Sequence, residues 1–174
     1  MLSIPKRVLL ALVAVLAVVS MLLSWAIRDP AREDIRAAFF GYVGDLRQGL
    51  KASASKRVHP DDLAGLKSSA LDRAGSEPVF RQQAMGFLEV RDAADLTAVP
   101  KERFFEFLLA RTMDMHPQVK DVLSEGRVVG TGVHRTGDEA DLTASFALDV
   151  PEGRRHFTMR LHLTRVDDVW FLRL

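Results

Sequence analysis

Histidine is the residue type in this sequence best suited to bind a metal ion or carry a proton. The chain has five: His59, His116, His134, His156 and His162. None stands in a His-x-His or His-x-x-x-His spacing, and two on one predicted strand face, His156 and His162, are roughly 20 Å apart. His134 could approach one of these two across a sheet. Without any cysteine, thiol catalysis and cysteine-ligated metal sites are excluded. We expect solvated surface histidines, no metal and no cofactor.

Acid–base catalysis requires a titratable group whose pKa is shifted by its surroundings, usually in a pocket. The predicted inward positions of two central strands are instead uniformly apolar: Leu142, Ala144, Phe146, Leu148, Val150, Phe157, Met159, Leu161 and Leu163. Tyr42, the only tyrosine, lies on the apolar side of a predicted helix, where it either belongs to the core or reaches a pocket. The Gly130-Thr131-Gly132 fragment lacks the third glycine and the helix of a dinucleotide fingerprint. We expect no catalytic residues.

Aromatic side chains distributed over the predicted helices and strands could meet between the two layers. They are Phe39, Tyr42, Phe104, Phe105, Phe146, Phe157 and Trp170. Either they line a pocket for a hydrophobic ligand, or they fill that space as the core. The sequence leaves both alternatives open.

A charge-free segment near the N-terminus dominates the hydropathy of the chain. In residues 8–27, 18 of 20 are apolar, and twenty helical residues span roughly 30 Å, the thickness of a bilayer core. Lys6 and Arg7 precede this segment. We predict a short cytoplasmic tail (1–7), a transmembrane signal-anchor helix (8–27) and an extracytoplasmic domain (28–174). The alternative is a signal peptide cleaved after Ala26.

The first half of the predicted domain has helical periodicity. Asp29-Pro30 suits a helix start, and apolar residues then recur every three or four positions. We predict helices at about 30–50, 61–74, 77–91, 100–115 and 117–124, with a loop at 51–60.

The second half alternates apolar and polar residues with a period of two. Turn signals at 136–139, 151–153 and 166–168 separate predicted strands at about 127–135, 139–150, 154–166 and 168–174. Short turns make consecutive strands antiparallel neighbours. The sequence therefore predicts an α+β fold in which several helices pack on a curved four-stranded antiparallel meander.

This order of elements resembles the nuclear transport factor 2-like superfamily of cone-shaped rolls, with the cystatin-like sheet as its near neighbour. The resemblance covers roughly residues 30–174 and includes the closing aromatic strand, Val169-Trp170-Phe171-Leu172. It implies a roll that often has a pocket between its sheet and helices. The superfamily holds enzymes, scaffolds and membrane-anchored secretion-system domains, so the resemblance implies no particular activity.

Charge gives the last indication of partners. Residues 28–174 carry 22 Lys and Arg against 23 Asp and Glu, a balance that does not favour nucleic-acid binding. A basic patch of Arg154, Arg155, Arg160 and Arg165 suits an acidic partner or anionic lipid, or is simply a solvated face.

We expect a non-enzymatic envelope protein in the inner or plasma membrane. It would be an accessory or assembly subunit with a protein partner or a second copy, or a binder of hydrophobic ligands. The alternatives are a small pocket enzyme of the isomerase or hydrolase type and a secreted binding domain.

Overall fold

The computed structural model describes residues 29–174, of which Asp34–Leu174 form one compact unit. Helix α2, Pro30–Arg47, starts at a cap in which the Asp29 carboxylate accepts a hydrogen bond from the Ala31 N–H at 3.1 Å. The predicted transmembrane segment, residues 8–27, lies outside the described part of the chain. Within residues 29–174, no helix has the length and apolar character needed to cross a membrane.

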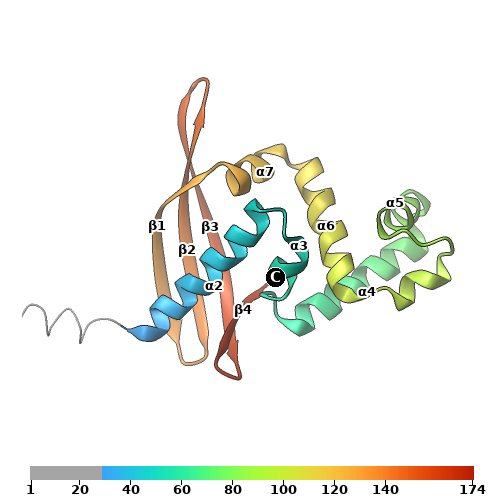
Figure 1. The fold of residues 1–174 in the computed structure, drawn as a ribbon, viewed down its shortest axis with the longest axis horizontal. Helices are drawn as coiled ribbons and strands as arrows, with labels where there is room; N and C mark the ends of the chain where they lie inside the picture. Colours follow the sequence, from blue (N-terminus) through green and yellow to red (C-terminus); the bar gives the residue numbers. More distant parts are fainter. Residues whose placement is uncertain (1–28) are drawn as a thin grey trace, which may run out of the picture. The chain divides into compact units, whose positions relative to one another are not determined.

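One antiparallel sheet follows the helices in the chain (Figure 1). Its strands are β1 (Arg127–Thr136), β2 (Glu139–Val150), β3 (Gly153–Val166) and β4 (Val169–Arg173), in the order β1-β2-β3-β4. The hairpin turns use left-handed residues, with φ of 63° at Gly137, 49° at Asp167 and 64° at Asp168. The predicted α+β class and four-stranded meander are confirmed.

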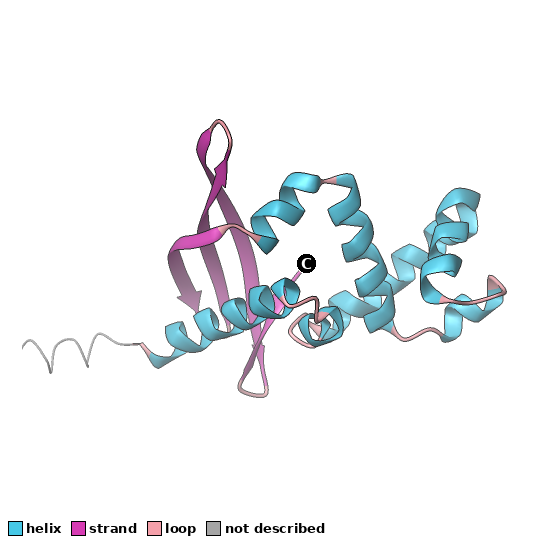
Figure 2. Cartoon of the chain, turned by 45° about the horizontal axis from the view of Figure 1, so that its top comes forward, coloured by secondary structure: helices cyan, strands magenta, loops and turns pink. Residues whose placement is uncertain are grey.

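The pleat separates an apolar face from a polar face of the sheet. In β2, the inward residues Ala140, Leu142, Ala144, Phe146 and Leu148 are all buried. Their partners in β3 include Phe157, Met159 and Leu161, which are only half-buried. The helices gather on the apolar side (Figure 2). The apolar face is therefore well covered over β2 and less completely covered over β3.

The core against the sheet is built from α2, α3 (Lys51–Ser55), α7 (Pro117–Ser124), part of α6 (Lys101–Met115) and the first turns of α4 (Pro60–Ser76). Phe39 of α2 is fully buried and meets Phe146 of β2 edge to face, with ring centroids 6.3 Å apart. The stretch 51–60, predicted as a loop, contains α3. Burial of apolar side chains in such a core is the main stabilising contribution available to a domain of this size.

A second core lies among helices alone. It joins α4 (Pro60–Ser76), α5 (Pro78–Leu88), the 3-10 helix η1 (Ala94–Ala98) and the other buried face of α6. Its buried residues are Ala70, Ala74, Phe80, Ala84, Leu88, Leu96, Phe104 and Phe107. The expectation that the helices pack on the sheet is thus incomplete. The small alanines let α4 and α5 pack closely with their neighbours, so α5 buries its apolar face in this second core.

The segment Arg57–His59 covers the outer edge of β4. The His59 N–H donates to the Leu172 carbonyl oxygen at 2.8 Å, and the Leu172 N–H donates to the Arg57 carbonyl oxygen at 2.8 Å. The Arg57 side chain reaches α2, where its Nε donates to Asp45 Oδ2 at 2.7 Å. It crosses Gly41 so closely that an added Cβ would stand 2.5 Å from the Arg57 Cζ. This glycine therefore makes room for the ion pair that joins α2 to the edge of the sheet.

We predict that Asp45→Asn lowers the free energy of unfolding at neutral pH by about 1 kcal/mol, because it removes a charge-assisted hydrogen bond. The hydrogen bond from Arg57 lowers the pKa of Asp45 below 3.8. A carboxyl with a lowered folded-state pKa stabilises the fold at pH values above its unfolded pKa, and this contribution is lost as the pH falls. The difference between wild type and variant should shrink below about pH 4.

Denaturant titration of the full chain in detergent micelles, at pH 7 and at lower pH, measures this difference. Asp72→Asn, in an exposed part of α4, is the matched control and should have little effect. Equal stability of Asp45→Asn and wild type at pH 7 would contradict the role given to this ion pair.

Candidate functional site

Most of the aromatic residues predicted to line a pocket lie in the core against the sheet. Phe39, Tyr42, Phe105, Phe146 and Trp170 are all buried there. Phe39 and Phe146 are fully buried, and the other three are less than a tenth exposed. Four of these rings fill the space between helices and sheet, while Phe146 also borders the cavity described below.

Phe104 lies elsewhere, in the second core, although its neighbour Phe105 faces the sheet. Consecutive residues of an α-helix point about 100° apart, so one helix can supply both cores. The Lys67 Nζ lies 5.9 Å from the centroid of the Phe104 ring. Spacing in the sequence identified α6 as a buried helix, but it could not assign the adjacent Phe104 and Phe105 to different neighbours.

A small apolar pocket remains between α7 and strands β2 and β3. It has a volume of about 200 Å³ and is lined by Gln118, Val119, Val122, Phe146, Phe157, Thr158 and Met159. Two of the predicted lining residues, Phe146 and Phe157, therefore do face a cavity. Pockets that enclose drug-sized ligands usually measure about 300–1,000 Å³. This one has room for one or two side chains.

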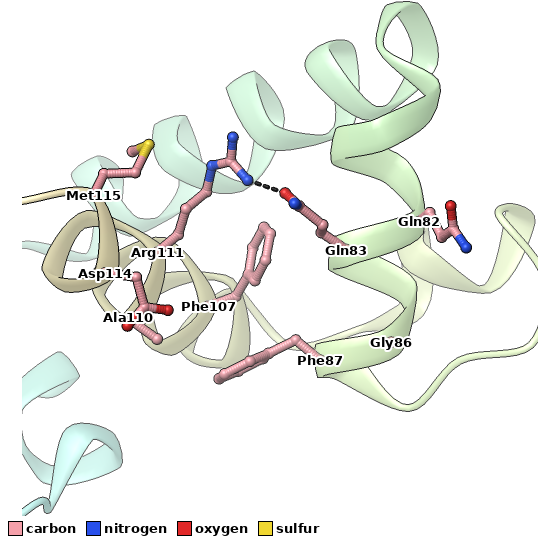
Figure 3. Close-up of a pocket in the computed structure, with 9 residues that line it drawn as sticks. All are labelled: Gln82, Gln83, Gly86, Phe87, Phe107, Ala110, Arg111, Asp114 and Met115. Carbon is pink, nitrogen blue, oxygen red and sulfur yellow. Dashed lines mark hydrogen bonds between the residues drawn. The ribbon is translucent and has the colours of Figure 1, made fainter.

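A larger groove lies between α5 and α6, with a volume of about 660 Å³ (Figure 3). Phe87 and Met115 line it and are 37% and 54% exposed. The Arg111 side chain of α6 donates to the Gln83 amide oxygen of α5 across the groove (Figure 3). Arg111 also stacks on Phe80, with its Cζ 5.3 Å from the ring centroid. The groove therefore combines apolar rings with a guanidinium that already contacts both helices.

A row of polar side chains crosses the outer face of the sheet. His134, Asp141, His162 and Arg173 stand opposite one another on the four strands. His162 Nδ1 lies 3.0 Å from Asp141 Oδ1, and an Arg173 terminal nitrogen lies 2.9 Å from Asp62 Oδ1 of α4. The sheet thus brings His134 into the row of His162, as the strand pattern allowed. Among residues 29–174, no group of three or more histidines and carboxylates is placed to hold a metal ion.

Tyr42 is only 8% exposed. Burial raises the pKa of its hydroxyl to about 12, because the phenolate would lose its hydration. The hydroxyl therefore stays protonated at neutral pH. Such a group can donate a hydrogen bond but is a poor general base.

One feature of the sheet was not predicted from the sequence. Strand β3 runs from Gly153 to Val166, but β4 pairs only with the part from His162 to Val166. The segment 154–160 therefore forms an outer edge with no neighbouring strand among the described residues. The unequal lengths of the predicted strands, 13 residues at about 154–166 against 7 at about 168–174, were the available signal.

Comparisons with known proteins leave the family undetermined. No family model matches the chain, and no curated protein matches it. One similar solved structure is an NTF-2-like protein of unknown function from Shewanella oneidensis MR-1. It shares 11% sequence identity with this chain, the match covers 82% of this chain and 93% of that chain, and the TM-score is 0.41. A match this weak does not establish a shared fold, so membership of that superfamily stays a prediction.

The environment of Tyr42 generates a direct test, since it is the only tyrosine in the chain. We predict that ultraviolet titration of the folded protein gives a tyrosinate midpoint near pH 12, against 10.0 for an ordinary tyrosine. A raised folded-state pKa stabilises the fold below the unfolded pKa, and this contribution is lost as the pH rises from about 10 to 12. The denatured chain is the control and should titrate near 10. A folded-state midpoint near 10 would show that Tyr42 is open to solvent.

Proposed function

We propose that the chain is a non-enzymatic, membrane-anchored subunit of an envelope complex, whose extracytoplasmic domain binds another protein. The observation that carries this proposal is the composition of the interior between helices and sheet. Its inward strand positions and the buried faces of α2 and α7 are apolar, and the buried hydroxyl of Tyr42 is held in its neutral form. Interior side chains of this kind stabilise a fold and offer no group for proton transfer.

The hydrophobic-ligand alternative has less support. The cavity between α7 and the β2–β3 hairpin is about 200 Å³, below the usual size for an enclosed ligand. The groove between α5 and α6 is larger, but Phe87 and Met115 are exposed along it. Exposed apolar side chains beside an open groove are more typical of a protein contact than of an enclosed small-molecule site.

The enzyme alternative would need a titratable partner for Tyr42. Asp45, one turn further along α2, is engaged by Arg57, and the carboxylates of Asp141 and Glu139 lie on the outer face of the sheet with His162. The Asp45 carboxylate is thus already paired, and His162 with its carboxylates lies on the face of the sheet opposite the core that holds Tyr42. This separation supports a binding function over an isomerase or hydrolase.

The test is the size of the native assembly. We predict that the full chain, tagged in its own cell and extracted in mild detergent, migrates with other polypeptides in a fixed stoichiometry. Replacing residues 8–27 with a leucine helix of equal length is the control, and it should keep the assembly if the domain makes the contact.

Recovery of free monomer alone would contradict the subunit proposal. The intact mass of the purified chain separates the anchored form from a secreted form that begins after Ala26.

A further inference from the structure

We propose that the open edge of β3, residues 154–160, binds an extended segment of a partner protein that joins the sheet as an added strand. The segment would place apolar side chains on the pocket side and an acidic side chain opposite Arg160. This inference rests on the proposed function and identifies the surface by which the subunit would bind.

The direction of the backbone groups follows from the ladder. The Arg165 N–H donates to the Asp138 carbonyl oxygen at 2.7 Å, on the β2 side. In an antiparallel strand, alternate residues direct their N–H and C=O groups to opposite edges. The groups of Arg154, His156, Thr158 and Arg160 therefore point away from β2. In the β4-paired part of the strand, the corresponding groups belong to His162, Thr164 and Val166.

This edge is long enough for specific binding. Seven residues extend over about 20 Å and offer four N–H donors and four carbonyl acceptors. The β2–β3 hairpin carries them beyond the end of β4 (Figures 1 and 2). Main-chain hydrogen bonds supply affinity when a peptide adds to a sheet edge, and pockets for alternate side chains supply specificity.

The pocket beside the edge provides such a site for side chains. Phe157, Thr158 and Met159 of β3 line it together with Val119 and Val122 of α7. Phe157 and Met159 are half-buried, so part of their apolar surface faces solvent. A strand added beside β3 would direct every second side chain toward this apolar surface. The pocket, at about 200 Å³, has room for one or two apolar side chains.

Charge on the polar side favours an acidic segment. Arg154 is engaged by Asp149 at 2.7 Å. Arg160 is exposed and has no ion-pair partner within the described residues. A carboxylate on the added strand, directly opposite Arg160, would form a favourable cross-strand pair.

The same charges disfavour a second copy of this chain. If two β3 edges paired antiparallel over residues 154–160, Arg154 of one copy would face Arg160 of the other at both ends. Like charges directly opposite one another destabilise a pair of strands. A different protein with a carboxylate at that position fits the edge better.

The test uses the full chain in detergent micelles and a displayed library of ten-residue peptides, with Asp or Glu fixed at alternate positions and apolar residues between them. We expect enrichment of binders. Thr158→Pro, which removes one outward N–H, should weaken the best binder at least tenfold, and so should Arg160→Glu.

Matched controls use the same substitutions elsewhere. Thr131→Pro removes an N–H at the opposite edge of the sheet, on β1, and Arg91→Glu makes the same charge change at an exposed site between α5 and η1. Both should bind the selected peptide as wild type does. Melting curves establish that each variant is folded, and Arg160→Glu keeps the test informative if Thr158→Pro does not fold.

In the peptide experiment, two results would overturn the proposal: no enrichment from the library, or selected peptides that bind Thr158→Pro and Arg160→Glu as tightly as wild type. Sedimentation that shows a dimer of the full chain, converted to monomer by Thr158→Pro, would assign the edge to a second copy instead. If the native assembly survives both variants unchanged, the edge proposal fails while the subunit proposal stands. If the wild-type chain itself is recovered without partner polypeptides, the result counts against the proposed function.

Discussion

Hydrogen bonding of the backbone at the edges of the sheet is the constraint on which this domain depends. A strand edge in a folded protein must be paired, covered or left open to water. The segment Arg57–His59 satisfies β4 at Leu172, and the Arg57 side chain fixes this segment to α2 through Asp45. Because β4 pairs only with His162–Val166 of β3, no strand within residues 29–174 pairs with the outer edge of residues 154–160. The surface that we propose for binding thus results from unequal strand lengths.

Helix α6 connects the two cores of the domain. Its Phe105 faces the sheet, whereas Phe104 and Phe107 face α4 and α5. Each core has its own set of buried aromatic residues, so packing changes around α5 need not alter the β3 edge. The groove at α5 and the edge at β3 are therefore separate surfaces, one rich in exposed aromatic and methionine side chains and the other in unpaired backbone groups.

The sequence predicted the sheet well, because period-two alternation and turn residues such as Gly137 report directly on local backbone geometry. It predicted less about packing between elements. Phe104 and Phe105 are adjacent and equally apolar, and only the tertiary structure shows that they enter different cores. The use of Arg57 was hidden for a similar reason, since its partners Asp45 and Leu172 are far from it in the chain. Among the aromatic candidates, Phe39 and Phe146 are both fully buried and in contact, yet Phe146 together with Phe157 also lines the cavity beside α7.

The most direct test of the account is residue-resolved amide hydrogen exchange along β3 in the full chain. The structure predicts alternation in residues 154–160: slow exchange at Arg155, Phe157 and Met159, whose N–H groups face β2, and fast exchange at His156, Thr158 and Arg160. At His162 and Thr164, which pair with β4, protection should return. Slow exchange at every residue from 154 to 160 would contradict the account, because it would show that the edge is already covered.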